Sequence, residues 1–278
     1  MGKGDIMNEI NSLVMTLVTG LFMLIGLIII TFTKNNEKVV NFSISMAFGV
    51  MVMLVILELI PESYELVSDS FNKPLNFVII FLFILIGIII LKILDKFIPD
   101  HDIEEENEKE INENFLHIGI VSSIALVLHN LIEGMAIYST MKTSFDMGIL
   151  VTIGVGLHNI PMGMIVSSTF YKANKNLKKT VLFTSLIALS TFLGGLIMFA
   201  LSNYITNLLL GILLCITLGM IIYIVVFELL SEILHNKNKK ESFTGIAFGI
   251  LIFILSSFFS ITYTNIRLFF IHGMAHIQ

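Results

Sequence analysis

Charged residues are scarce in this chain, and the scarcity is the first guide to its class. Only 13% of the 278 residues are Asp, Glu, Lys or Arg, against about a quarter in soluble domains. Hydrophobic residues make up 56% of the chain, which excludes an ordinary water-soluble fold. Its single cysteine, Cys215, excludes a disulfide or a cysteine-based zinc site within one chain. Tryptophan is absent, so tyrosine and phenylalanine remain as interfacial aromatic residues.

The apolar residues fall into eight runs, each long enough to cross a bilayer as a helix of about 20 residues. We therefore predict an all-α membrane protein with eight transmembrane helices, forming a single polytopic domain over residues 1–278. The runs lie near residues 10–32, 39–60, 75–91, 115–138, 148–171, 180–202, 205–230 and 243–264.

The basic residues predict the orientation of these helices. Twelve of the 16 fall in the first, third, fifth and seventh loops, and Lys and Arg are enriched in cytoplasmic loops. Both termini are therefore expected outside. The longest of these loops, at about residues 92–114, is dense in acid and is expected to be a solvated cytoplasmic linker. A weak metal-collecting role is the alternative for this loop.

Ionisable side chains within hydrocarbon are costly, so their positions indicate function. In this sequence they fall in the second, fourth, fifth and seventh runs or at the ends of those runs. Such groups face protein or water rather than lipid. We therefore expect these four helices to form an inner bundle that lines a polar path, with the first, third, sixth and eighth helices outside it. The residues are Glu58, Glu62, His117, His129, Glu133, His158, Glu228, Glu232 and His235.

The fourth and fifth runs carry a repeated His-Asn pattern. His129 and Glu133 are four residues apart, so they lie on one face of a helix. An imidazole and a carboxylate placed in this way can bind one divalent cation. His158 repeats the pattern 29 residues later, with Met162 in the place of the acid. These residues predict a metal site within the membrane.

Neighbouring residues add further candidate ligands. Asn130 and Asn159 directly follow the two histidines and are either ligands or partners in hydrogen bonds between helices. Pro61 and Pro161 each free the backbone carbonyl four residues earlier. Those carbonyls are either oxygen ligands or the mark of a simple kink.

Three segments together resemble the ZIP (Zrt/Irt-like) family of divalent metal transporters. They are His-Asn-Leu-Ile-Glu-Gly from residue 129, His-Asn-Ile-Pro-Met-Gly from residue 158, and Glu-Leu-Ile-Pro-Glu from residue 58. The resemblance implies uptake of a divalent ion as the transported substrate, zinc first, then iron, manganese or cadmium. We expect a metal site of His129, Glu133, His158, Asn130, Asn159 and Met162, and pathway acids Glu58, Glu62, Glu228 and Glu232.

The chain departs from the family pattern at two places. Members usually have a Glu where this chain has Met162, and many have an acid in the sixth span, where this chain has Ser190 and Thr191. Glu133 is then the sole carboxylate of the core motifs. We predict a mononuclear site, softer if the Met162 thioether takes part.

Missing motifs bear on the rival functions. No P-loop is present, which argues against a primary pump, and no HExxH motif is present, which argues against an intramembrane metalloenzyme. We expect a multi-pass plasma-membrane transporter, not an enzyme, whose inner and outer bundles move against each other. A channel through which ions pass down their gradient is the alternative mechanism. The protein's partners are the metal ion and the lipid bilayer, not nucleic acid, and a homodimer is compatible with this architecture. The alternative is a membrane sensor that binds an ion without moving it.

Overall fold

The structure is a computed structural model that describes residues 3–33, 37–97 and 108–275, and all regular secondary structure over these residues is helical. Eight segments are long and apolar enough to cross a membrane, which confirms the predicted fold class. They are Met7–Phe32, Lys38–Ser68, Leu75–Asp95, Asn114–Thr143, Phe145–Asn174, Leu177–Leu201, Asn207–His235 and Lys239–Phe258.

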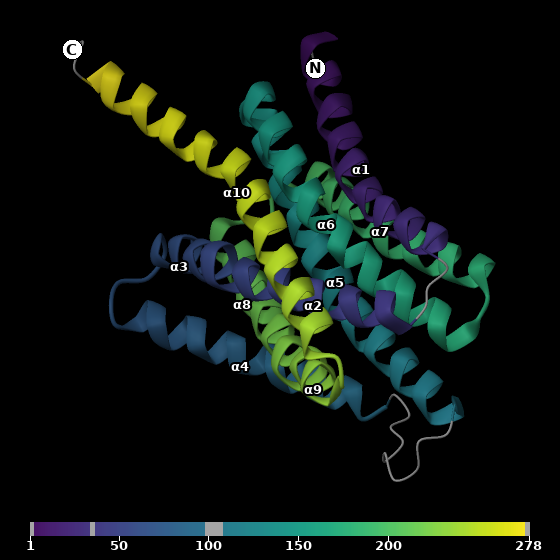
Figure 1. The fold of residues 1–278 in the computed structure, drawn as a ribbon. Coiled ribbons are helices and arrows are strands. Elements are labelled where there is room, and N and C mark those ends of the chain that lie inside the picture. Colours follow the sequence, from purple (N-terminus) through teal and green to yellow (C-terminus); the bar gives the residue numbers. More distant parts are fainter. Residues whose placement is uncertain (1–2, 34–36, 98–107, 276–278) are drawn as a thin grey trace.

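These spans are built from ten α-helices and two π-helical segments. The second span consists of α2, η1 and α3, and the seventh of α8, η2 and α9. The start of α1 and the end of α10 lie at the same end of the molecule (Figure 1). The elements are α1 Lys3–Phe32, α2 Glu37–Leu54, η1 Val55–Leu59, α3 Ile60–Ser68, α4 Leu75–Asp95, α5 Glu108–Thr143, α6 Phe145–Asn174, α7 Leu177–Leu201, α8 Asn207–Tyr223, η2 Ile224–Leu229, α9 Leu230–His235 and α10 Lys239–Ala275.

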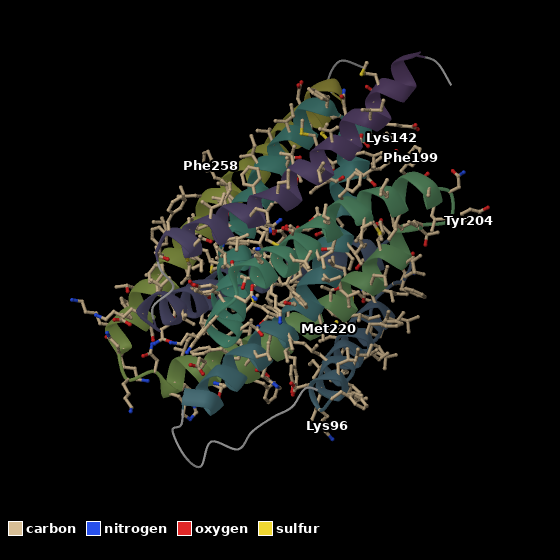
Figure 2. All side chains as sticks on the ribbon, turned by 90° about the vertical axis from the view of Figure 1, so that its right-hand side faces the viewer. Lys96, Lys142, Phe199, Tyr204, Met220 and Phe258 are labelled. Carbon is tan, nitrogen blue, oxygen red and sulfur yellow. The ribbon has the colours of Figure 1, made fainter. Side chains whose placement is uncertain are left out.

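The helices on either side of the acidic loop are longer than hydropathy predicts. Helix α4 continues to Asp95, four residues past the expected end of the run, and α5 already begins at Glu108. Residues 98–107 of the expected loop lie outside the described residues. Lys96, just after α4, and Lys142, in the last turn of α5, lie toward opposite ends of the molecule (Figure 2). Asp95 is therefore part of a transmembrane helix rather than of a loop.

Two of the predicted pathway acids lie in the π-helical segments. Glu58 is in η1 and Glu228 is in η2. The wider turn shows in the backbone, where the Ile60 N–H donates to the Val55 carbonyl five residues back. Pro61 follows within the first turn of α3. Single π-helical turns are frequent at functional sites, and here each one carries an acid into the protein interior.

Four helix pairs touch through reciprocal glycines. At each of these glycines an added Cβ would lie 1.9 to 2.5 Å from a carbonyl oxygen of the facing helix. Such close approach is available only to small residues, and packing is a main source of attraction between helices in lipid. The pairs are Gly26 with Gly163 (α1 and α6), Gly49 with Gly249 (α2 and α10), Gly87 with Gly219 (α4 and α8), and Gly134 with Gly194 (α5 and α7).

The helices pack into two groups. Helices α1, α5, α6 and α7 contact one another and form the α5/α6 group. The remaining elements, which include the close pairs α2 with α10 and α4 with α8, form the α2/α8 group. The two groups meet mainly where α2 and α10 lie against α6. Every reciprocal glycine pair lies within one group.

Candidate metal site

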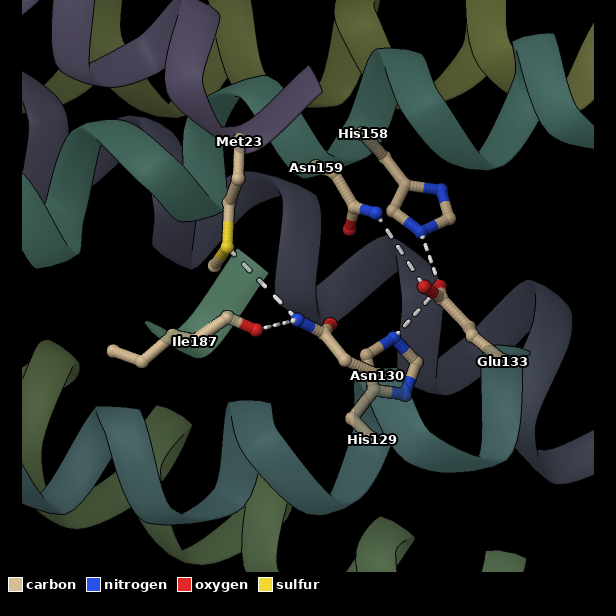
Figure 3. Close-up of polar contacts among 7 residues, drawn as sticks. All are labelled: Met23, His129, Asn130, Glu133, His158, Asn159 and Ile187. Atoms are coloured by element: carbon tan, nitrogen blue, oxygen red, sulfur yellow. Dashed lines mark hydrogen bonds and ion pairs between the residues drawn. The ribbon is translucent and has the colours of Figure 1, made fainter. Parts of the chain in front are cut away.

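Helices α5 and α6 bring three of the predicted ligands together. The Oε1 atom of Glu133 lies 3.0 Å from Nε2 of His129 and 2.8 Å from Nε2 of His158 (Figure 3). All three side chains are buried, with exposed fractions of 2%, 8% and 2% for His129, Glu133 and His158. One ligand atom from each lies within 4.8 Å of the others. We call these three residues the His129 site.

Local helix geometry explains this arrangement. His129 and Glu133 are one turn apart on α5, as their spacing predicts. Helix α6 continues through Pro161 and presents His158 to Glu133. The imidazole of His158 also stacks on the ring of Phe253 from α10, with 6.0 Å between ring centroids and 24° between the planes. Phe253 is fully buried, so the α2/α8 group covers the site at this point.

Several polar atoms around the His129 site have no hydrogen-bond partner among the described residues. They include Nδ1 of His129 and the side-chain oxygens of Asn130 and Asn159. Burying such atoms without a partner is costly. Imidazole nitrogen and carboxylate or amide oxygen are also the donors that a divalent transition metal accepts. The donor set therefore fits a metal ion as cargo.

The two asparagines form hydrogen bonds between helices. The amide nitrogen of Asn130 donates to the Ile187 carbonyl of α7 at 3.3 Å, and it lies 3.9 Å from the sulfur of Met23 on α1. The amide nitrogen of Asn159 donates to Oε2 of Glu133 at 3.5 Å (Figure 3). Their nitrogens therefore tie α5 to its neighbours, which leaves the side-chain oxygens as the atoms that could reach a metal.

The other predicted residues around the site are a buried methionine and two acids. Met162 lies one turn after His158 on α6, is fully buried and belongs to the main apolar cluster. Glu58 interacts electrostatically with all three residues of the His129 site. Glu62, one turn further along the second span, interacts electrostatically with Glu58 and Glu133. The two acids thus lead from the first turn of α3 toward the site.

A second group of potential ligands lies nearer the start of α5. Nε2 of His117 lies 2.8 Å from Oδ1 of Asp95 on α4 and 3.7 Å from Oε2 of Glu228 in η2. The Tyr223 hydroxyl donates to Oδ2 of Asp95 at 2.6 Å. Close by, the Asn114 amide donates to Oε2 of Glu232 at 3.2 Å. Asp95, His117 and Glu228, which we call the Asp95 cluster, have ligand atoms within 4.8 Å of one another.

Sequence reasoning did not find Asp95 or Tyr223. It placed Asp95 among the acids of the loop because the apolar run ends at residue 91. The signal that could have found Asp95 is its position within one helical turn of that end, because charged residues often lie in the last turn of a membrane helix.

Comparison with known proteins agrees with the geometry. Residues 99–257 match the family model described as ZIP zinc transporter. The zinc transporter ZupT of Clostridium perfringens is 30% identical over 281 residues, which cover 92% of this chain and 98% of that protein. The zinc transporter ZupT of Streptococcus mutans is 29% identical over 252 residues, with 87% and 95% covered. The chain therefore belongs to the ZIP family, and it is a multi-pass membrane protein that transports metal ions and not an enzyme.

Proposed function

We propose that this protein carries zinc into the cytoplasm through the His129 site. The observation that carries the proposal is the buried Glu133 oxygen that lies within 3.0 Å of two imidazole nitrogens from two helices. The names of the relatives support zinc as the cargo. Iron, manganese and cadmium accept similar ligands and are the competing cargoes.

The site holds one ion at a time. Glu133 contributes the one carboxylate of the His129 site, and the position one turn after His158 carries an uncharged methionine. A second divalent ion beside the first would lack a negative charge to separate the two cations. The oxygens of Asn130 and Asn159 complete the coordination of the single ion, and Met162 is a softer ligand for it.

The polar residues order the path of the ion. Glu62 and Glu58 attract it from the outer side, the His129 site binds it, and the Asp95 cluster receives it before it passes Glu232. His117 and His129 lie on the same helix and are 12 residues apart, which corresponds to about 18 Å along its axis. This distance is too long for the ion to pass directly from the ligands of one site to those of the other. Either the protein changes conformation or the ion diffuses between the two sites.

The glycine pairs indicate which parts move. Sliding the inner spans as one body against the outer spans would separate every reciprocal glycine pair, because each pair joins one inner span to one outer span. Moving the α5/α6 group against the α2/α8 group keeps all four pairs. We therefore favour the second motion over the one that the charge pattern alone predicted. It carries the whole His129 site past Glu58 and Phe253.

Burial and the distribution of lysines support an arrangement of the spans in the membrane. In an 18-residue apolar window of each span, 56% to 67% of the residues are buried in the second, fourth, fifth and seventh spans, and 11% to 39% in the other four. This ranking supports an inner bundle of those four spans within a single domain. The lysine distribution supports termini outside and the Asp95 cluster toward the cytoplasm, in a protein of the plasma membrane.

Reconstitution tests the proposal. Purified protein in liposomes is expected to take up zinc, and His129→Ala is expected to abolish this uptake. His235→Ala is the matched control, because His235 is an exposed histidine at the end of α9 whose ring bonds only to the Ser231 carbonyl among the described residues. Parallel uptake of iron, manganese and cadmium ranks the cargoes.

Two results would overturn the proposal. If the wild-type protein binds zinc in a His129-dependent manner but moves none of the four ions, it is a sensor rather than a carrier. If His129→Ala and His235→Ala have equal uptake, the ion does not pass through the His129 site.

A further inference from the structure

A groove runs along the outer surface of the α5/α6 group between α1 and α7. It consists of two adjoining cavities of about 310 and 80 Å³, which share Leu27, Thr31 and Leu177 in their walls. Its rim residues Ile28 and Val181 are 51% and 41% exposed. In a bilayer this groove opens toward the lipid, at the end of α1 that is followed by the first basic loop.

The two cavities differ in the polarity of their walls. The larger cavity is lined mainly by apolar side chains, among them Leu24, Leu27 and Val181. The smaller cavity has three hydroxyl-bearing residues in its wall, Thr31, Tyr171 and Thr180, beside three aliphatic ones. A phospholipid likewise combines an apolar acyl chain with a polar ester region, so the two cavities match its two parts.

Three lysines are neighbours in the sequence of residues that line the smaller cavity. Lys172 comes directly after Tyr171, and Lys178 and Lys179 lie between Leu177 and Thr180 in the first turn of α7. Lys178 and Lys179 are both exposed. The sequence contains no Asp or Glu from residue 147 to residue 227, so α6, α7 and α8 after Asp146 contribute no acid to balance these lysines.

We propose that the α1/α7 groove binds an anionic phospholipid, with an acyl chain in the larger cavity and the phosphate at Lys178 and Lys179. Charge complementarity selects the anionic headgroup, since each lysine near the membrane surface contributes about 1 kcal/mol of attraction to anionic lipid. The lipid would lie on the α5/α6 group and leave the His129 site untouched, so the inference is independent of the proposed cargo.

Lipid binding to the purified full-length chain tests the proposal. Phosphatidylglycerol and phosphatidylcholine with identical acyl chains are titrated, and bound lipid is counted by native mass spectrometry. The double variant Lys178→Gln/Lys179→Gln is expected to bind phosphatidylglycerol about 30-fold more weakly, because it loses two such attractions. Val181→Trp, which fills the larger cavity, is expected to weaken binding with both lysines still in place.

Matched controls separate the groove from general membrane charge. Lys142→Gln removes an exposed lysine at the other end of the molecule, and Leu186→Trp adds bulk to a lipid-facing position of α7 outside the groove. Both are expected to bind as the wild type does. Equal binding of the two lipids by the wild type, or equal weakening by Lys142→Gln, would overturn the proposal. If Val181→Trp binds phosphatidylglycerol as the wild type does, and inorganic phosphate binds the wild type as tightly as phosphatidylglycerol, the site binds an anion and not a lipid, and the proposal is overturned.

Discussion

Oε1 of Glu133 lies 2.8 Å from Nε2 of His158, and this contact joins the two helices that carry the proposed metal site. The same oxygen lies 3.0 Å from His129. Glu133 therefore holds two potential ligands in place and also supplies the negative charge that a divalent cation requires. A site with one carboxylate depends on that side chain more than a site with several.

Replacing Glu133 with glutamine tests this dependence. Glu133→Gln keeps the size of the side chain but removes its charge, so zinc binding is expected to fall by at least about 100-fold, beyond the loss seen when outer-shell partners are removed. Isothermal titration calorimetry on the purified protein measures this loss. Glu65→Gln, at an exposed acid of α3, is the control. Binding that survives in Glu133→Gln would exclude Glu133 as a ligand.

Met162→Glu tests the second departure from the family pattern. A carboxylate one turn after His158 would add a negative charge beside the site, so we expect tighter binding of zinc and manganese and room for a second ion. The number of bound ions per chain and the order of ion preference in liposome uptake are the measurements. If neither changes, Met162 lies too far from the ion to affect it. Met162→Leu, which removes the sulfur but keeps the apolar volume, separates loss of the thioether from gain of charge.

The Asp95 cluster makes a different prediction from the His129 site. His117→Ala removes the imidazole between Asp95 and Glu228, so we expect zinc to reach the His129 site normally but to leave it more slowly. Uptake in liposomes should fall roughly tenfold, while the affinity measured by calorimetry stays within error at the higher-affinity site. A fall in both quantities would place His117 in the binding step instead.

The glycine contacts predict a stability effect. In Gly134→Ala the new methyl group would lie 1.9 Å from the Thr191 carbonyl oxygen, so α5 and α7 would have to separate. Overpacking of this kind costs about 1 to 3 kcal/mol or more, and thermal unfolding in detergent should show a lower midpoint. Gly211→Ala is the milder comparison, because its new methyl group would lie 3.0 Å from Cβ of Leu66, and it should lower the midpoint less. Equal midpoints for the two variants would contradict the close contact.

The sequence predicts the fold well for a physical reason. A bilayer demands long apolar helices, so hydropathy alone locates the eight spans, and the cost of burying charge identifies Glu133, His129 and His158 as exceptional. Helical spacing also places His129 and Glu133 on one face. All of these inferences depend on properties that are local in the chain.

Features that depend on contacts between distant segments could not be predicted. The wider turns at Glu58 and Glu228 require π-helical backbone, which the side-chain pattern does not indicate. The Asp95 cluster draws on three helices, and one of its members lies past the end of an apolar run. The stacking of Phe253 on His158 is equally invisible, because a phenylalanine in an apolar helix carries no signal of what it touches.

The reciprocal glycines have a consequence for how freely this sequence can change. At each pair the contact is made by backbone atoms, with the glycine Cα facing a carbonyl oxygen of the other helix, so it does not depend on the chemistry of neighbouring side chains. The distance between paired helices is thus specified at eight positions, and the many lipid-facing positions need only remain apolar. Extensive substitution among aliphatic residues should therefore leave the architecture intact, whereas single changes at those eight positions should be selected against.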